Sequence, residues 1–138
     1  MIKTAKMKKN LIIVGSIASG KTTLANYIAN FFKKPATLLF NGYRNKYGKG
    51  IPPFYFEGCD HDTDLIIVEC ETNNLEDIET FILRLSHPII IEKRGYKSFK
   101  IEPTIVVTMQ ELPHALIRPC ITNHFDFTFL TNVHPLSR

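Results

Sequence analysis

Close to the start of this chain stands a glycine-rich segment, Gly15-Ser16-Ile17-Ala18-Ser19-Gly20-Lys21-Thr22. Its spacing, Gly-x-x-x-x-Gly-Lys-Thr, is the complete P-loop pattern. The run 11–14 before it is entirely apolar, which predicts a buried parallel strand. After it, Leu24, Ile28 and Phe31 share one face of a predicted helix over 21–32. A strand, a glycine-rich loop and a helix in this order are the context that the pattern requires.

Each residue type in this segment has a chemical reason to bind phosphate. Glycine permits backbone angles that other residues resist, so the loop can direct successive N–H groups at phosphate oxygens. The helix that follows offers unpaired N–H groups and the positive end of its dipole. Lys21 reaches the β- and γ-phosphates, and the Thr22 hydroxyl is a ligand for Mg²⁺. The sequence therefore predicts a site for ATP with Mg²⁺, with nucleotide-binding residues Gly15, Ser16, Ile17, Ala18, Ser19, Gly20, Lys21, Thr22 and Thr23.

The remainder of the chain alternates strands with helices. Further apolar runs predict strands over 36–40, 65–68, 105–108 and 125–130. A helix over 75–86, with Asn74 as its N-cap, has an apolar face made of Leu75, Ile78, Phe81, Ile82 and Leu85. Two short strands, 89–92 and 98–102, flank a turn and predict a β-hairpin. The pattern indicates an α/β fold: a P-loop NTPase with a three-layer α/β/α arrangement, a mainly parallel central sheet and a β-hairpin insertion.

Length and composition are those of a single globular domain. The chain has 138 residues, of which 44% are hydrophobic and 22% are charged. We expect a basic N-terminal tail over 1–10 and a single P-loop NTPase domain over 11–138. No apolar run approaches the roughly 20 residues of a membrane span. Three cysteines without a Cys-x-x-Cys pair favour a reduced protein, so we expect a cytoplasmic location and no membrane partner.

The strand predicted over 65–68 leads into two acidic residues. A P-loop enzyme that hydrolyses its nucleotide needs a carboxylate at the end of a neighbouring strand, where it holds the water shell of Mg²⁺. Glu69 is the predicted metal residue, and Glu71 is a candidate for the base that orients the attacking water. Cys70 lies between them. An acidic cluster upstream matches no defined ligand spacing and favours a polar loop over a metal site; its members are Asp60, His61, Asp62 and Asp64.

Four segments, in this order, resemble the superfamily 3 helicases of small DNA viruses and plasmids. They are the P-loop, the stretch 54–59 leading into the strand before Glu69, the stretch 89–110, and Phe125-Asp126-Phe127 after Arg118. The third is the most telling, because a hairpin with a basic tip runs through a proline into an apolar strand that ends at Gln110. By this resemblance Gln110 senses the γ-phosphate, and Arg118 is an arginine finger supplied to a neighbouring subunit.

The basic hairpin is the predicted nucleic-acid contact. The resemblance places Lys93 and Arg94 against single-stranded DNA, and Lys97 lies in the same segment. Cations neutralise phosphates and aromatic rings stack on bases, which suits the interleaved Tyr96 and Phe99. A solvated hairpin whose aromatic rings pack inward is an equal alternative from the residues alone. The net charge of +4 is compatible with a polyanionic partner.

The function implied is a nucleic-acid-stimulated ATPase of superfamily 3 helicase type, acting in replication of a virus or mobile element. The family works as homo-oligomeric rings, so the resemblance implies a ring, with a hexamer as the expected form. The residues expected to carry catalysis are Lys21, Glu69, Glu71, Gln110 and Arg118. Two alternatives stay open: a small P-loop kinase that phosphorylates a nucleotide or metabolite, and a nucleotide-binding regulator that hydrolyses little.

Overall fold

Five strands form one sheet in the order β2-β3-β6-β1-β7 in the computed structural model, which describes residues 10–16, 19–42, 56, 58–86, 88–93 and 95–130. Every pairing between neighbours in this sheet is parallel. The strands are β1 (Asn10–Gly15), β2 (Pro35–Phe40), β3 (Leu65–Cys70), β6 (Thr104–Met109) and β7 (Phe125–Leu130). The predicted α/β class and parallel sheet are confirmed.

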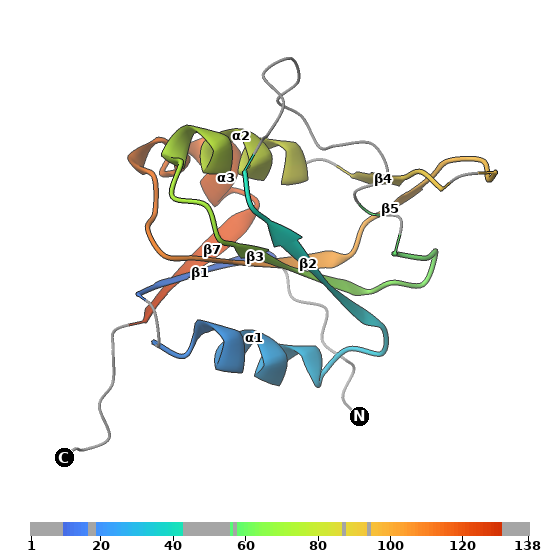
Figure 1. Cartoon of the computed structure of the whole chain (residues 1–138), viewed down its shortest axis with the longest axis horizontal. Helices are drawn as coiled ribbons and strands as arrows, with labels where there is room; N and C mark the ends of the chain where they lie inside the picture. Colours follow the sequence, from blue (N-terminus) through green and yellow to red (C-terminus); the bar gives the residue numbers. More distant parts are fainter. Residues whose placement is uncertain are drawn as a thin grey trace.

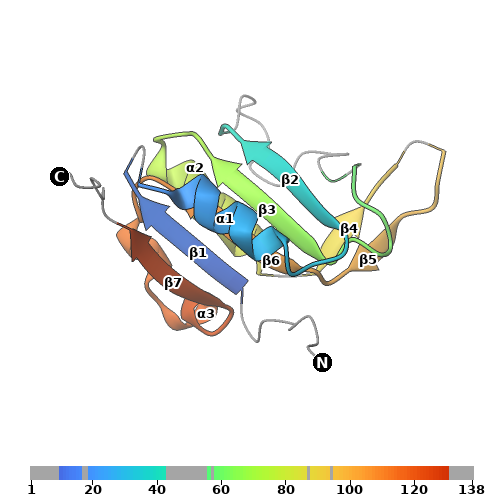
Figure 2. The same ribbon diagram turned by 90° about the horizontal axis from the view of Figure 1, so that it is seen from below.

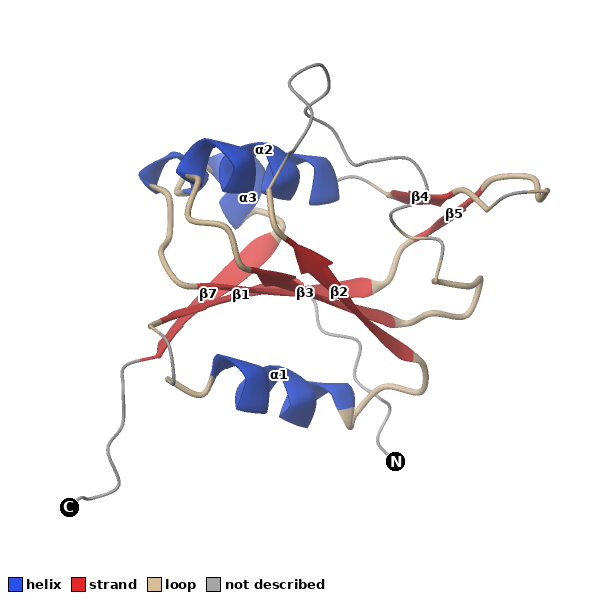
Figure 3. Cartoon of the chain, viewed as in Figure 1, coloured by secondary structure: helices blue, strands red, loops and turns tan. Residues whose placement is uncertain are grey.

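Helices cover both faces of the sheet (Figures 1 and 3). α1 (Lys21–Ala29) lies below it in Figure 1, and α2 (Leu75–Leu85) and α3 (Pro119–Thr122) lie above it, with a short 3₁₀ turn at His114–Leu116. From β1 the chain crosses the positions of β6 and β3 to reach β2 at one edge of the sheet. It then travels in the other direction, through β3 and β6, and crosses β1 to reach β7 at the other edge. Because crossovers between parallel strands are right-handed, the two directions of travel place their helices on opposite faces.

Two apolar clusters hold these layers together. On the α1 face of the sheet, Ala25 packs with the buried strand residues Ile13, Leu65, Ile67 and Val106. The larger cluster lies on the α2 face. It contains the buried strand residues that alternate with those of the first cluster, together with four buried residues of α2: Ile78, Phe81, Ile82 and Leu85. Successive strand residues point to opposite faces, so each buried strand contributes to both clusters.

The predicted N-cap of α2 is confirmed. The Asn74 side chain accepts a hydrogen bond of 3.1 Å from the backbone N–H of Asp77, which satisfies one unpaired donor of the first turn. Four of the five residues predicted for the apolar face are buried, whereas Leu75 is 39% exposed. Leu75 is the first residue of the helix and lies beyond the part of α2 that packs on the sheet.

The hairpin is also confirmed, and it leaves the sheet at one edge. β4 (Ile89–Ile91) and β5 (Phe99–Ile101) pair antiparallel as a separate ribbon. β5 is followed after two residues by the start of β6, so the hairpin lies at the edge formed by the amino ends of the strands, which we term the amino edge. Figure 2 shows it projecting beyond the sheet, away from the carboxyl end of β1.

The first helix is shorter than predicted. It ends at Ala29 rather than at residue 32, and β2 begins at Pro35. The Asp64 carboxylate explains this end, because its two oxygens accept 2.8 Å hydrogen bonds from the backbone N–H groups of Lys33 and Lys34. With the helix ended, Phe32 packs on the α1-face cluster, and Phe31, which was expected in the apolar stripe, is 51% exposed.

At the N-terminus, β1 begins with Asn10, one residue earlier than expected, and residues 1–9 lie outside the described residues. Asn10 Oδ1 accepts a 2.9 Å hydrogen bond from the backbone N–H of Ile105 and so ties β1 to β6. Within the described part of the chain, no helix is long and apolar enough to cross a membrane.

Candidate functional site

The carboxyl ends of the parallel strands form one edge of the sheet, the carboxyl edge, and gather polar residues from three strands. β1 ends at Gly15, β6 ends just before Gln110, and β3 carries Glu69 near its end. The register aligns them: Glu69 pairs with Thr108 of β6, and Thr108 pairs with Ile13 of β1. β6 therefore stands between the strand that enters the Gly15–Thr22 loop and the strand that carries Glu69.

The alternation of side chains decides which of these residues face α1. Leu65 and Ile67 of β3 lie in the α1-face cluster, so Glu69 continues the same face. By the same alternation Thr108 follows Val106 onto that face. Cys70 points the other way and packs against the α2-face cluster. The sheet thus places Glu69 on the face covered by α1, whose first residue is Lys21.

The Lys21 side chain folds back onto the Gly15–Thr22 loop. Its Nζ donates hydrogen bonds of 2.7 Å to the Gly15 carbonyl oxygen and 2.9 Å to the Ser16 carbonyl oxygen. An ammonium has three donors, so one remains for a further acceptor. Partial burial lowers the pKa of Lys21 below its usual value, because the charged form loses solvation. A cation held in this way is suited to an anionic ligand.

The two glycines of the loop have different roles. Gly20 precedes α1 with φ of +96°, a left-handed conformation that glycine adopts without strain. Gly15 is needed for space, since a Cβ there would overlap Ser19 Oγ and lie 3.0 Å from the Leu130 carbonyl oxygen. Ser19 Oγ is itself buried, without a hydrogen-bond partner among the described residues. Within the described residues, the loop therefore contains a buried hydroxyl that no protein group satisfies.

The remaining loop residues are only partly described. Thr22 and Thr23 are exposed in the first turn of α1, where helix N–H groups lack intrahelical partners. Ile17 and Ala18 lie outside the described residues. The connections leaving β1 and β6 pass to opposite faces of the sheet, α1 on one and α3 on the other. In open α/β sheets such a divergence marks the crevice where ligands bind.

The acidic residues after β3 differ in their surroundings. Glu69 is partly buried on the α1 face, and Glu71 is exposed, with its backbone N–H donating to the Phe40 carbonyl oxygen at 2.9 Å. Burial raises the pKa of the Cys70 thiol to about 12, so it stays protonated and uncharged near neutral pH. Cys70 therefore supplies neither a carboxylate nor a thiolate. Gln110 is exposed directly after β6.

The hairpin residues lie at the opposite edge of the sheet, and one of them is engaged within the chain. Lys93, whose side chain is 24% exposed, forms an ion pair in which Nζ lies 2.8 Å from Asp60 Oδ1. Asp60 Oδ2 also pairs at 3.0 Å with Lys34, which in turn pairs at 3.0 Å with Asp62. Two ammonium groups on one carboxylate lower the pKa of Asp60 to about 2. The predicted polar loop is thus the anchor of the hairpin.

The other hairpin residues divide between inward and outward positions. Phe99 packs inward, and its ring stacks on His61 with centroids 3.7 Å apart. Tyr96 is 74% exposed, and Lys97 is exposed beside it. Gly95 turns the tip with φ of +79°. Arg94 lies outside the described residues. The two rings therefore differ: Phe99 packs inward, as in a solvated hairpin, whereas Tyr96 is exposed, as a ring that stacks on bases would be.

Arg118 lies on the α2 face of the sheet, opposite the face covered by α1. It precedes α3, and its Nη2 pairs at 3.2 Å with Glu79 Oε2 of α2. The pair joins the two helices that cover this face. A role for Arg118 toward a neighbouring subunit stays a prediction.

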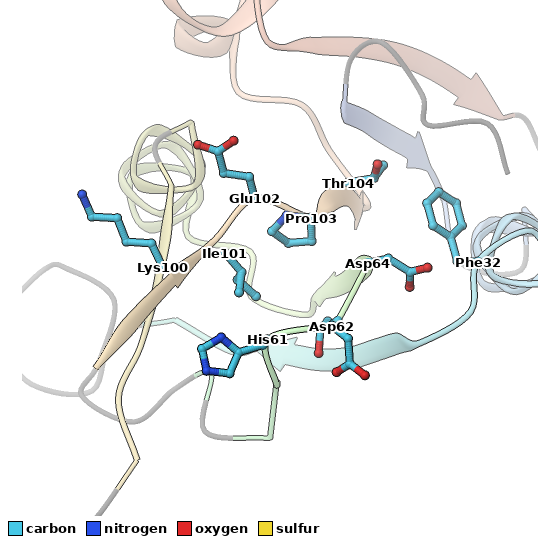
Figure 4. A pocket seen from close by; sticks show the side chains of 10 residues that line it. Phe32, His61, Asp62, Asp64, Lys100, Ile101, Glu102, Pro103 and Thr104 are labelled. Atoms are coloured by element: carbon cyan, nitrogen blue, oxygen red, sulfur yellow. The ribbon is translucent and has the colours of Figure 1, made fainter. Parts of the chain in front are cut away.

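A pocket of about 500 Å³ opens at the amino edge (Figure 4). One wall is formed by Lys100, Glu102 and Pro103 after the hairpin, the other by the loop that carries His61, Asp62 and Asp64, and Phe32 of the α1–β2 connection closes one end. Asp62 and Asp64 already bond Lys34 and the backbone of the α1–β2 connection. The pocket is far from the Gly15–Thr22 loop and is separate from the site at the carboxyl edge.

The anchor of the hairpin predicts an acid-sensitive attachment. A depressed pKa means that Asp60 contributes stability above its unfolded pKa of about 3.9 and loses it as the pH falls through about 2. The protection of the β4 and β5 amides from hydrogen exchange, measured relative to the intrinsic exchange rate at each pH, should therefore be constant between pH 5 and 8. Asp60→Asn should speed this exchange by less than about tenfold, because exposed ion pairs stabilise weakly.

Asp62→Asn is the matched control, since Asp62 pairs with Lys34 and not with Lys93 among the contacts described. It should leave the exchange of the hairpin amides close to that of the unaltered protein. Equal exchange in Asp60→Asn and the unaltered protein would show that the ion pairs do not hold the hairpin.

Two site features were missed from sequence. The tie between Lys93 and Asp60 spans 33 positions, and no local pattern signals such a contact. From the sequence, Thr108 is predicted only as the last residue of a buried strand. Its signal was a single hydroxyl at the end of the run Ile105-Val106-Val107, in a position that the register places beside Glu69.

Comparisons with known proteins show a likeness of fold. No protein-family model matches the sequence, and no curated protein matches it. Among solved structures, the chain is similar to the C-terminal region of NrS-1 in its A form without ligand, with a TM-score of 0.56 and 11% sequence identity. The match covers 94% of this chain and 30% of that one. At this identity the likeness concerns the fold alone, over nearly the full length of the present chain.

Proposed function

We propose that the chain binds ATP with Mg²⁺ at the Gly15–Thr22 loop and is a P-loop NTPase. The observation that carries this proposal is the Lys21 ammonium, held by the Gly15 and Ser16 carbonyl oxygens at the start of α1. Two of its donors fix it in place, and the third is left for a phosphate oxygen. The N–H groups and positive dipole end of α1 favour the same anion.

The residues present fit such a ligand. Ser19 Oγ is a buried hydroxyl without a partner among the described residues, and a phosphate oxygen would satisfy it. Side-chain-free Gly15 keeps the loop close to the sheet. Thr22 supplies a hydroxyl oxygen and Glu69 a carboxylate, and oxygen donors are what Mg²⁺ prefers. Mg²⁺ in such a site neutralises charge that develops on the phosphates.

The proposed reaction is hydrolysis of the γ-phosphate, stimulated by single-stranded DNA, in a protein of superfamily 3 helicase type. Lys21 holds the phosphates, Glu69 orients the water shell of the metal, and Gln110 at the end of β6 lies where it can report on the γ-phosphate. The placement of β6 between β1 and β3 supports this division of roles, because it brings Gln110 and Glu69 to the same edge as the loop. Arg118 would act across a subunit boundary in a homo-oligomeric ring, and the setting would be replication of a virus or mobile element.

One observation favours the weakly hydrolysing regulator as second candidate. The residue after Glu69 is Cys70, which points to the α2 face with a raised pKa. It supplies no second carboxylate for the attacking water, and Glu71 is exposed in the following loop. If Glu71 cannot take that role, nucleotide binding would persist with little turnover.

Steady-state ATP hydrolysis with and without single-stranded DNA separates these functions. We expect DNA to raise the rate, and Lys97→Ala to weaken DNA binding without changing the rate in the absence of DNA. Loss of one phosphate contact should reduce the slope of log affinity against log salt by about 0.7. Lys33→Ala, which removes another exposed lysine shortly after the end of α1, is the matched control.

The outcomes are distinct. Binding of ATP without turnover, with or without DNA, would support the regulator. Turnover that DNA leaves unchanged would contradict the helicase-type proposal and would call for a screen of phosphoryl acceptors, as expected of a small kinase. Equal salt slopes for Lys97→Ala and the control would remove Lys97 from the DNA contact.

A further inference from the structure

Thr108 lies between the two parts of the proposed site. It pairs in register with Ile13 of β1 on one side and with Glu69 of β3 on the other. Side chains in one row of a parallel sheet point to the same face, from strands about 4.8 Å apart. Of these two neighbours, Ile13 is apolar, and Glu69 alone has a side chain that can accept a hydrogen bond.

The shape of the Thr108 side chain does not require a hydroxyl. Thr108 is 4% exposed, and the preceding residues of β6, Ile105, Val106 and Val107, are all apolar and β-branched. Valine would have nearly the same shape at position 108 without a hydroxyl. A buried hydroxyl lowers stability unless it is hydrogen-bonded. The register places the Glu69 carboxylate beside this hydroxyl, on the neighbouring strand and the same face.

We propose that Thr108 is a positioning residue for Glu69. When the nucleotide and Mg²⁺ are bound, the Thr108 hydroxyl donates a hydrogen bond to one oxygen of the Glu69 carboxylate and leaves the other directed at the metal's water shell. Carboxylates around a metal are generally oriented by such outer partners, whose loss costs about 10- to 100-fold in metal affinity or activity. The inference rests on the proposed function, because it assigns a residue to that site.

β6 offers a matched control. Thr104 lies on the same strand and the same face, is also 4% exposed, and stands at the amino edge, four residues from Thr108. It pairs in register with Leu65, which has no polar side chain. Thr104→Val and Thr108→Val therefore make the same chemical change at equal burial, and only the second removes a neighbour of Glu69.

The test is binding of Mn²⁺ to the protein with ATP, followed by electron paramagnetic resonance. Thr108→Val should weaken Mn²⁺ binding by about 10-fold, the lower end of the range for an outer partner. Thr108→Ser, which keeps the hydroxyl, should stay near the unaltered protein, as should Thr104→Val. The midpoint of thermal unfolding should be unchanged or higher in Thr108→Val, because valine keeps the β-branched shape.

A purely structural threonine would give another pattern. Equal Mn²⁺ affinity in Thr108→Val and the unaltered protein would overturn the inference while leaving the proposed nucleotide site intact. Equal weakening in Thr104→Val would overturn it as well, since the effect would then follow from a change in the sheet. Failure of the unaltered protein to bind Mn²⁺ with ATP would overturn the proposed function and this inference together.

Discussion

Lys21→Ala should lower the affinity for ATP by about 10- to 100-fold. A hydrogen bond to a charged group contributes about 1.5–3 kcal/mol, and 1.4 kcal/mol corresponds to a factor of ten in affinity. The variant also frees the Gly15 and Ser16 carbonyl oxygens from the ammonium, so the loop loses two hydrogen bonds. Titration of the protein with a fluorescent ATP analogue measures the affinity directly.

Lys33→Ala is the control, because it removes the same charge from the region beyond the other end of α1. Its affinity for the analogue should equal that of the unaltered protein, which excludes a general effect of net charge. If both variants bound the analogue as tightly as the unaltered protein, Lys21 would not contact the nucleotide, and the proposed site would be wrong.

Glu69→Gln should separate binding from hydrolysis. The change keeps the size of the side chain and removes the negative charge that faces α1 at the carboxyl edge. We expect kcat to fall by about 100-fold, the upper end of the cost of losing an outer partner of a metal. Binding of the nucleotide without metal should be retained, because Lys21 and the loop N–H groups are unaltered.

The neighbouring carboxylate supplies the comparison. Glu71→Gln changes an exposed residue of the loop after β3, and its effect on kcat tests the candidate base that the sequence left open. A loss of kcat in Glu71→Gln and none in Glu69→Gln would contradict our assignment of the metal role to Glu69 and would give that role to Glu71. A loss in both would mean that the two carboxylates act together on metal and water.

Most elements of the fold could be predicted because their signals are local. A short run rich in β-branched residues, such as Leu65-Ile66-Ile67-Val68, favours a buried strand, and Asn74 caps the helix that follows it through a contact three residues away. The end of α1 could not be predicted, because Asp64, which holds Lys33 and Lys34 out of the helix, is 30 residues further along the chain. The exposure of Phe31 follows from that distant contact.

The candidate site shows the same division. Spacing alone singled out the loop, because Gly15, Gly20, Lys21 and Thr22 stand at the four fixed positions of the phosphate-loop pattern. The hairpin lysines looked equivalent in sequence, but the fold ties Lys93 to Asp60 and leaves Lys97 exposed. Their difference arises from one ion pair between segments that the sequence does not link.

By itself, the sequence determined the strand–loop–helix unit whose helix begins at Lys21, the α/β class and the presence of a hairpin, since each depends on residues within a few positions of one another. Only the tertiary structure decided that β6 separates β1 from β3, that Glu69 and Thr108 face α1 while Cys70 faces α2, and that the hairpin lies at the edge opposite the loop. Strand order and the choice of face depend on which apolar surfaces pack together across the whole chain, and no local spacing encodes that choice.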